Sequence, residues 1–232
     1  MEFDRIYAEV DLGRIEENMK AMKEHLRPGT KMYGVVKTDA YGHGAVPVAR
    51  TIDRFVCGYA VATVDEGLKL RRHGIEKEIL CLGPVSAGRY QECLENDISL
   101  PMFEYWRAKE LSDAAVAEGK TAKIHIAVDT GMSRIGLFPD EGSVETIKEI
   151  AELPDLRIAG MFTHFARADE ADKTNAGEQY RRFHEFCDDV KAAGVAVPVC
   201  HCSNSAGIVE LPDFNMDAVR AGITIYGLYP SD

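Results

Sequence analysis

The feature that most constrains the fold of this chain is an alternation, kept from end to end, of short apolar strand-like runs with stretches of helical periodicity. Such an alternation predicts parallel strands joined by helices, and eight strands are the number that closes an α/β barrel. Barrel strands are expected over residues 32–37, 56–62, 78–82, 98–102, 122–129, 156–163, 197–202 and 218–226. The predicted fold class is therefore α/β, a (β/α)8 TIM barrel, which fits within 232 residues.

Two further elements are expected ahead of the first barrel strand. Residues 5–12 resemble a strand that lies outside the barrel, and Asp11 is placed to cap a helix that follows it. The apolar residues of that helix recur at helical spacing: Leu12, Ile15, Met19, Met22 and Leu26. We find no internal repeat and no linker-like segment, so residues 1–232 are expected to form one domain.

Composition excludes several classes of partner. With 38 acidic and 27 basic side chains, the formal charge of −11 disfavours binding to nucleic acid or to acidic membrane surfaces. No apolar run reaches the roughly 18 residues that would span a membrane, and residues 1–5 lack a signal core, so a soluble cytoplasmic protein is expected. Six cysteines lie scattered at positions 57, 81, 93, 187, 200 and 202 and are expected to be free thiols.

A metal site is not expected at the segment Cys200-His201-Cys202. In a strand, successive side chains point to opposite faces, so this one-residue spacing separates neighbouring ligands, and no second ligand pair is evident.

Polar residues whose side chains could react or bind a ligand follow the predicted strands, where a barrel of this type places its active site. A lysine, Lys37, follows the first strand and precedes a glycine-flanked Tyr/His loop. Arg134 lies after the fifth strand, His164 ends the sixth, residues 203–205 (Ser-Asn-Ser) follow the seventh, and Arg220 accompanies the eighth. An amine, two guanidinium groups, an imidazole and a hydroxyl-rich turn suit an anionic, planar, carbonyl-bearing cofactor such as pyridoxal 5'-phosphate.

Each of these residues also has an ordinary structural interpretation. Lys37 could be a solvated surface charge, and His164 a half-buried histidine with no catalytic part. The Ser-Asn-Ser turn could simply cap a helix, and the two arginines could pair with structural carboxylates. The prediction of a functional site therefore depends on their common location at the strand ends.

Five separated segments resemble the fold-type III pyridoxal-phosphate enzymes and, within them, the alanine racemase family. They are residues 36–44 (VKTDAYGHG), 129–136 (DTGMSRIG), 163–166 (THFA), 201–206 (HCSNSA) and 220–227 (RAGITIYG). The resemblance covers the whole chain, with Thr38 where alanine is usual. It implies racemisation of L- and D-alanine, an isomerase activity that supplies D-alanine for peptidoglycan.

The resemblance also implies roles for particular residues. Lys37 would attach the cofactor covalently and serve as one of two bases that exchange the α-proton, while Arg134 would contact the substrate carboxylate. The catalytic set implied is Lys37, Arg134, His164 and Arg220. The cofactor-binding set implied is Lys37, Tyr41, His164, Asn204, Ser205, Arg220, Gly222 and Ile223, of which Tyr41, Ser205 and the amides of Gly222 and Ile223 would hold the phosphate. Arg220 would face the pyridine nitrogen and, because a guanidinium does not lose its proton, would leave that nitrogen unprotonated.

Two departures from the family pattern shape the expected activity. Many relatives carry a lysine, often carbamylated, where this chain has Ala127, so the placement of Arg134 stays open. Complete racemases are homodimers with a β-rich C-terminal domain, and a tyrosine from the partner's domain is the opposite base. We expect this chain to be the N-terminal barrel domain without that β-domain, able to hold the cofactor but poorly active alone.

Alternative functions stay open at this stage. One is a stand-alone barrel that binds pyridoxal phosphate for cofactor homeostasis without turnover, and another is a serine racemase of the same family. A hydrolase barrel without cofactor is disfavoured, since no convincing carboxylate pair or nucleophile triad is evident.

Overall fold

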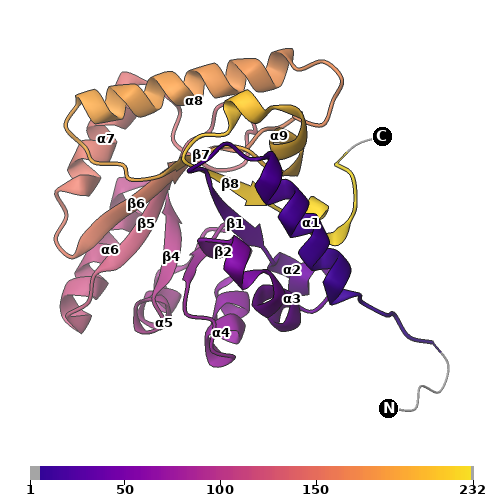
Figure 1. The fold of residues 1–232 in the computed structure, drawn as a ribbon. Helices are drawn as coiled ribbons and strands as arrows, with labels where there is room; N and C mark the ends of the chain where they lie inside the picture. Colours follow the sequence, from indigo (N-terminus) through magenta and orange to yellow (C-terminus); the bar gives the residue numbers. More distant parts are fainter. Residues whose placement is uncertain (1–5, 231–232) are drawn as a thin grey trace.

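The structure, a computed structural model, describes residues 6–230 and contains a closed barrel of eight parallel strands wrapped by helices (Figure 1). The strands are β1 (Lys31–Val35), β2 (Gly58–Val61), β3 (Glu78–Cys81), β4 (Ile98–Met102), β5 (Ala122–Ala127), β6 (Leu156–Phe162), β7 (Cys200–His201) and β8 (Ala218–Ala221). Each strand pairs with the next along the chain, and β8 pairs with β1 to close the ring. The TIM-barrel prediction is confirmed.

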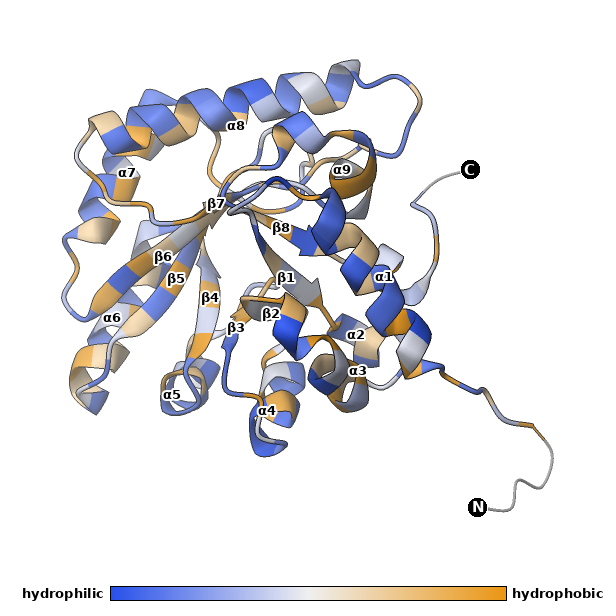
Figure 2. Ribbon diagram, in the orientation of Figure 1, coloured by the Kyte–Doolittle hydropathy of each residue, from blue (hydrophilic) through white to orange (hydrophobic). Residues whose placement is uncertain are grey.

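Helices connect the strands and cover the outside of the barrel (Figure 1). The α-helices are α1 (Leu12–His25), α2 (Lys37–Tyr41), α3 (Ala45–Ile52), α4 (Val64–Arg72), α5 (Tyr90–Glu95), α6 (Tyr105–Glu118), α7 (Glu141–Ala151), α8 (Thr174–Ala192) and α9 (Ser205–Glu210). Short 3-10 helices are η1 (Asp53–Phe55), η2 (Ala87–Arg89), η3 (Pro212–Phe214) and η4 (Ile223–Tyr226). Hydrophilic and hydrophobic residues alternate along these helices, as expected of elements that cover a sheet (Figure 2).

The helix predicted ahead of the barrel is present as α1. Its N-cap is Asp11, whose carboxylate accepts hydrogen bonds from the backbone N–H groups of Gly13 (2.9 Å) and Arg14 (3.2 Å). A cap of this kind contributes about 1 kcal/mol. The buried face of the helix carries Ile15, Met19 and Met22.

One predicted strand is absent, and another is shorter than predicted. Residues 6–11 form no strand, and the remaining first residue of that prediction lies outside the described residues. The barrel is closed by the β1–β8 pair, so it offers no open edge to which an extra strand could add. At the other end, β8 stops at Ala221, and residues 223–226 turn into η4, where the Ile225 N–H donates to the Gly222 carbonyl (2.9 Å).

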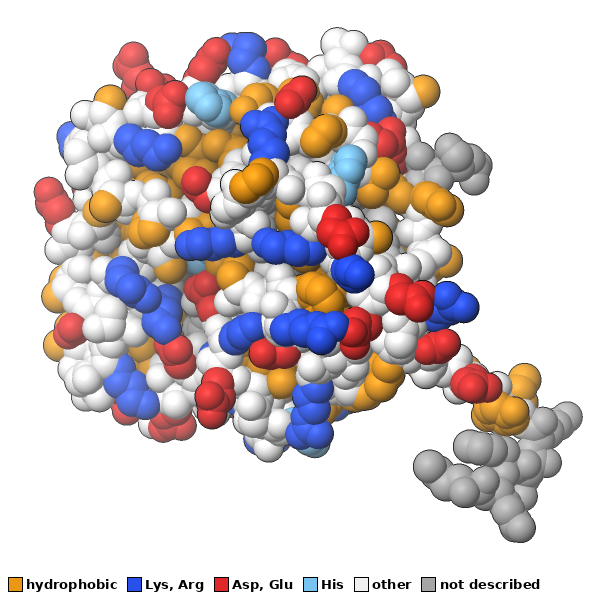
Figure 3. Space-filling view, in the orientation of Figure 1, with side chains coloured by type: hydrophobic (Ala, Val, Ile, Leu, Met, Phe, Trp, Pro, Cys, Tyr) orange, Lys and Arg blue, Asp and Glu red, His pale blue; other side chains and the backbone are white. Residues whose placement is uncertain are grey.

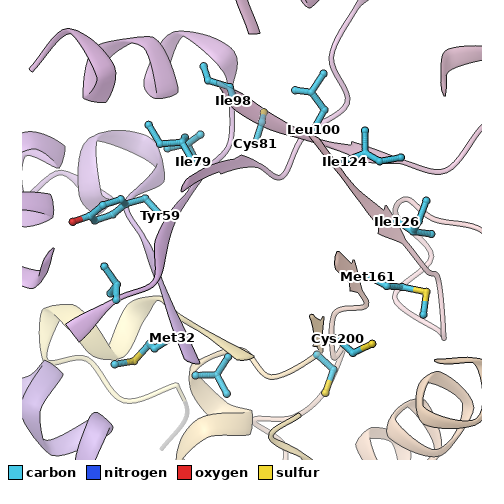
Figure 4. Close-up of a cluster of buried hydrophobic side chains, with 14 of the residues drawn as sticks. Met32, Tyr59, Ile79, Cys81, Ile98, Leu100, Ile124, Ile126, Met161 and Cys200 are labelled. Carbon is cyan, nitrogen blue, oxygen red and sulfur yellow. The ribbon is translucent and has the colours of Figure 1, made fainter. Parts of the chain in front are cut away.

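The outer wall of the barrel forms the main apolar core. Figure 4 shows side chains of this core arranged around the ring of strands. They are Met32, Tyr59, Ile79, Cys81, Ile98, Leu100, Ile124, Ile126, Met161 and Cys200, all nearly or fully buried. Because side chains alternate along a strand, their neighbours on β1, β3, β4, β5 and β7 face the barrel interior.

The distribution of charged side chains, the state of the cysteines and the lengths of the helices can be compared with the expectations from composition. Acidic and basic side chains are interspersed over the face seen in Figure 3. All six cysteines are free thiols, as predicted. Over residues 6–230, no helix is long and apolar enough to cross a membrane, and no group of three or more His, Cys, Asp or Glu side chains gathers as a metal site.

Candidate active site

The carboxyl ends of the strands open into a cavity of about 540 Å³. All nine site residues named from the sequence line it: Lys37, Tyr41, Arg134, His164, Asn204, Ser205, Arg220, Gly222 and Ile223. Ser203, the first residue of the predicted hydroxyl-rich turn, does not, because it is fully buried with its hydroxyl 3.5 Å from the carbonyl oxygen of Phe214. The structure therefore brings together side chains that are up to 186 residues apart in the chain.

Lys37 begins a tight left-handed turn rather than ending a strand. The strand stops at Val35, and the four residues 38–41 have φ between 51° and 56°. For residues other than glycine this conformation costs roughly 1–2 kcal/mol each, so it needs support from outside the turn. The Lys37 ammonium lies 5.7 Å from the centre of the Tyr41 ring, at the cavity wall.

Two carboxylates support this turn. Glu66, at the start of α4, accepts a hydrogen bond from the backbone N–H of Thr38 (2.7 Å) and another from Ala62 (2.7 Å). Asp39 accepts from the N–H of Ala45 (2.9 Å) and pairs with the Lys69 ammonium (2.7 Å). These contacts tie the residue that follows Lys37 to the neighbouring β2–α4 loop.

A hydroxyl and amide cradle lies beside the lysine. The Ser205 hydroxyl oxygen accepts hydrogen bonds from the N–H groups of Gly222 (3.1 Å) and Thr224 (3.3 Å) and from the Thr224 hydroxyl (3.0 Å). A Cβ on Gly222 would come within 3.3 Å of the Tyr41 hydroxyl, so this close approach depends on glycine. Ile223 starts η4, and the first N–H groups of a helix have no acceptor within it. Such groups suit a phosphate oxygen.

Asn204 and two residues that the sequence analysis overlooked shape this cradle. The Asn204 side chain accepts from the Gly207 N–H (3.0 Å) as the cap of α9, in agreement with the ordinary interpretation of the turn. Thr224 contacts Ser205 as described above. Tyr226 packs its ring 5.0 Å from that of Tyr41 and donates its hydroxyl to the Val35 carbonyl (2.9 Å). Both lie where strand β8 was expected to continue.

Arg220 is buried, with 3% of its surface exposed, and none of the described residues gives it a carboxylate partner. Nη1 contacts Nδ1 (2.7 Å) and the carbonyl of His201 (3.0 Å), while Nη2 donates to the carbonyls of Thr163 (2.6 Å) and Cys202 (3.1 Å). The structural-carboxylate interpretation is thereby excluded. Burial lowers the pKa of Arg220 to about 10, which still leaves it charged near neutral pH.

His164 lies next to Arg220 and is neutral. Its Nδ1 is 3.3 Å from Nη2 of Arg220, and because a guanidinium can only donate, this nitrogen is an acceptor. Burial, and then the positive charges of Arg220, Arg134 and Lys37, lower the pKa of His164 to about 3. Three cations therefore surround one imidazole, and the site is poised to receive negative charge.

This lowered pKa predicts a loss of stability in acid. In the unfolded chain His164 regains its ordinary pKa of 6.5, so between pH 6.5 and about 3 the unfolded state binds a proton that the folded state does not. The free energy of unfolding should therefore fall as the pH is lowered through this window. Urea unfolding at pH 7.5, 5.5 and 4.5 measures the slope, and His164→Gln should make it shallower. An equal slope in the variant would contradict the prediction.

Arg134 lies exposed in the loop between β5 and α7. The Asp129 carboxylate shapes this loop by accepting from the N–H groups of Gly131 (3.0 Å) and Ser133 (2.9 Å). Within residues 6–230, Arg134 forms no hydrogen bond or ion pair with an acidic side chain, and Ala127, buried in β5, offers none. Its guanidinium is available to an anion that enters the cavity.

The fold and the cavity define an α/β-barrel protein whose mouth combines a lysine amine with an anion cradle. Comparison with known proteins gives the family: the profile of "Alanine racemase, N-terminal domain" matches residues 10–230, and the chain belongs to this family. Alanine racemases of Clostridium novyi and Methanococcus maripaludis are 44% and 42% identical to it, over 98% of the chain and 59% and 61% of their own lengths.

A solved structure agrees. The alanine racemase of Clostridium difficile 630, in complex with cycloserine, superimposes with a TM-score of 0.94 at 39% identity, over 95% of this chain and 61% of that one. The chain thus spans about three fifths of the length of the relatives it matches.

Proposed function

We propose that this chain is the cofactor-binding barrel of an alanine racemase, which holds pyridoxal 5'-phosphate and exchanges the α-proton of alanine. The observation that carries the proposal is the convergence of Lys37, Arg134, Arg220 and the Ser205 cradle on one cavity. The D-alanine formed would serve peptidoglycan synthesis in the cytoplasm.

The cavity fits this cofactor at both ends. The Ser205 cradle and the space left by Gly222 suit the phosphate. The Lys37 ammonium forms no hydrogen bond or ion pair with residues 6–230, so the amine is available for covalent attachment. When bound, pyridoxal phosphate supplies an aldehyde carbon for that amine and a ring that withdraws electrons from the substrate Cα.

Arg220 is placed to control the ring nitrogen. Its two terminal nitrogens are held by protein acceptors, whereas Nε–H has no acceptor among the described residues. We propose that Nε–H donates to the ring nitrogen and, because Arg220 keeps its proton, leaves that nitrogen unprotonated. A weaker electron sink favours proton exchange over decarboxylation or transamination.

The remaining residues divide the work of binding and proton transfer. Arg134, free of acidic partners, would bind the substrate carboxylate. Lys37 would hold and return the α-proton at Nζ on one face of the substrate. His164, with a pKa lowered to about 3, is too weak a base to serve as the second one. We propose that the opposite base comes from a partner subunit of a homodimer, so this chain alone should racemise slowly.

The experiment that tests the proposal uses this chain with added pyridoxal phosphate. A visible absorption band should form, and borohydride reduction followed by peptide mapping should place the label on Lys37. Alanine in D₂O should then show exchange at Cα that exceeds its rate of two-way racemisation. A label on another lysine, or rapid racemisation in both directions, would refute the corresponding part of the proposal.

The same experiment separates the alternatives. Labelling of Lys37 without any Cα exchange would indicate a barrel that binds the cofactor without turnover. Faster exchange with serine than with alanine would indicate a serine racemase.

A further inference from the structure

The interior of this barrel is polar. Tyr33 (β1), Ser99 (β4), His125 (β5), His201 (β7) and Arg220 (β8) are nearly or fully buried, and the Glu78 side chain (β3) is 25% exposed. On β1, β3, β4, β5 and β7 they alternate with apolar side chains of the outer wall that Figure 4 labels, and on β8 Arg220 lies between Val219 and Ala221. Barrel interiors of this type are usually filled by branched apolar residues. Buried polar groups are costly unless they are hydrogen-bonded, so their partners must be accounted for.

Four of these residues form one continuous chain from the mouth of the barrel to its floor. Nη1 of Arg220 lies 2.7 Å from Nδ1 of His201, and Nε2 of His201 lies 3.0 Å from Nδ1 of His125. Nε2 of His125 then lies 3.3 Å from Oε1 of Glu78. Glu78 is the first residue of β3, so it marks the end of the barrel opposite the cavity.

The positions of the protons in this chain follow from Arg220. A guanidinium can only donate, so Nδ1 of His201 is an acceptor and the proton of His201 is on Nε2. That proton points at Nδ1 of His125, which must accept it in turn. The proton of His125 is therefore on Nε2 and points at the Glu78 carboxylate.

The alternative arrangement fails at His201. If His125 carried a proton on Nδ1, as an imidazolium would, His201 would face a donor at each ring nitrogen. It could satisfy both only by losing its own last proton, which a neutral imidazole does not do near neutral pH. His125 is thus neutral although it contacts a carboxylate.

Glu78 is suited to terminate the chain because it is held as an anion. The Tyr33 hydroxyl donates to its Oε2 (2.6 Å) and the Ser99 hydroxyl to its Oε1 (2.8 Å). Burial acts to raise the pKa of Glu78, but hydrogen bonds from His125, Tyr33 and Ser99 outweigh it and keep the pKa below its ordinary value. An ionised carboxylate accepts and never donates, so it selects the His125 tautomer with the proton on Nε2.

We propose that Glu78 is a positioning residue for Arg220: through His125 and His201 it fixes both imidazole tautomers and so holds Nη1 of the guanidinium on His201. Without this acceptor, His125 can move its proton to Nδ1, which turns His201 into a donor toward Arg220. The guanidinium would then be repelled and Nε would leave its place at the cavity. The two tautomers follow from the hydrogen bonds between these four side chains alone, whereas the effect on the ring nitrogen of pyridoxal phosphate rests on the proposed function.

The first test is ¹⁵N NMR of the histidine rings in the cofactor-free chain. In the unsubstituted chain, His125 and His201 should both carry their proton on Nε2. Glu78→Gln retains an acceptor oxygen and should preserve this pattern, whereas Glu78→Met should move a share of His125 to the Nδ1 form. A proton on Nδ1 of either ring in the unsubstituted chain would overturn the inference, even if Glu78→Met failed to fold.

The second test measures binding of pyridoxal phosphate and of its analogue with carbon in place of the ring nitrogen. Glu78→Met should bind pyridoxal phosphate about tenfold more weakly, the loss expected for one charge-assisted hydrogen bond, but should bind the analogue as the unsubstituted chain does. Ser99→Ala, which removes a bond to the same carboxylate without breaking the chain, is the matched control and should change neither affinity. Equal weakening for both ligands would show a merely structural role for Glu78. If the unsubstituted chain bound neither ligand, the proposed function would fail while the NMR result still decided the tautomers.

Discussion

Lys37→Ala is expected to reduce exchange of the alanine α-proton by about 10³-fold or more, because the variant loses both the covalent attachment point and the base. The fold should survive, since the Lys37 ammonium makes no hydrogen bond with residues 6–230 and lies 5.7 Å from the centre of the Tyr41 ring. The measurement is deuterium incorporation at Cα in D₂O with saturating pyridoxal phosphate, together with the unfolding midpoint in urea.

A surface lysine provides the matched control. Lys20 lies on α1, where its ammonium is 3.9 Å from the Glu24 carboxylate and 68% of its side chain is exposed. Lys20→Ala should leave both exchange and borohydride labelling unchanged. Full labelling of Lys37→Ala after reduction would place the reactive amine elsewhere and remove the basis of the proposed function.

The architecture could be predicted from the sequence because it depends on a pattern that repeats. Eight apolar runs separated by helical stretches leave few alternatives to a closed barrel, and each predicted barrel strand overlaps an observed one. The two largest errors concern local apolar stretches with no partner strand to bond. Residues 6–11 and 223–226 have strand-like composition, but strand pairing in this ring is already complete.

The mouth of the barrel was predictable for a related reason. Parallel strands place their carboxyl ends on one side, so a polar residue just after a strand is at the mouth whatever the exact register. This is why Lys37, His164 and Arg220 meet in one cavity as predicted. The left-handed conformation of residues 38–41 was not predictable, because Glu66 supports it from a different strand connection.

The polar residues of the barrel interior are visible in the sequence, but their contacts with one another could not be predicted. Glu78 and His125 are charged or polar residues within apolar runs, but which inward side chains meet depends on the register between strands. Here the β5–β6 register shifts between Ile124 and His125. Gly160 on β6 also leaves the space His125 occupies, since a Cβ there would lie 2.6 Å from its Nδ1. Such complementarity appears only when strands distant in sequence are paired.

Arg220→Leu is expected to destabilise the fold by about 3–5 kcal/mol, the range found when one partner of a buried charged network is removed. Leucine fills much of the volume but leaves the carbonyls of Thr163 and Cys202 and the Nδ1 of His201 without their donor. Each buried acceptor left unsatisfied costs about 1–3 kcal/mol, whereas lost packing contributes less because the side chains are similar in size. Urea unfolding of the cofactor-free chain measures this effect separately from catalysis.

A conservative variant and a surface control show whether the loss of stability comes from the buried guanidinium. Arg220→Lys keeps the charge, but a single ammonium cannot reach acceptors spread around a planar fork, so it should recover only part of the lost stability. Arg157→Leu replaces an exposed arginine of strand β6 and should change stability by no more than about 0.5 kcal/mol. If Arg220→Leu unfolded at the same urea concentration as Arg157→Leu, the buried guanidinium would have no net role in stability. The free-energy cost of burying the Arg220 guanidinium would then be offset only by its hydrogen bond to the ring nitrogen of pyridoxal phosphate.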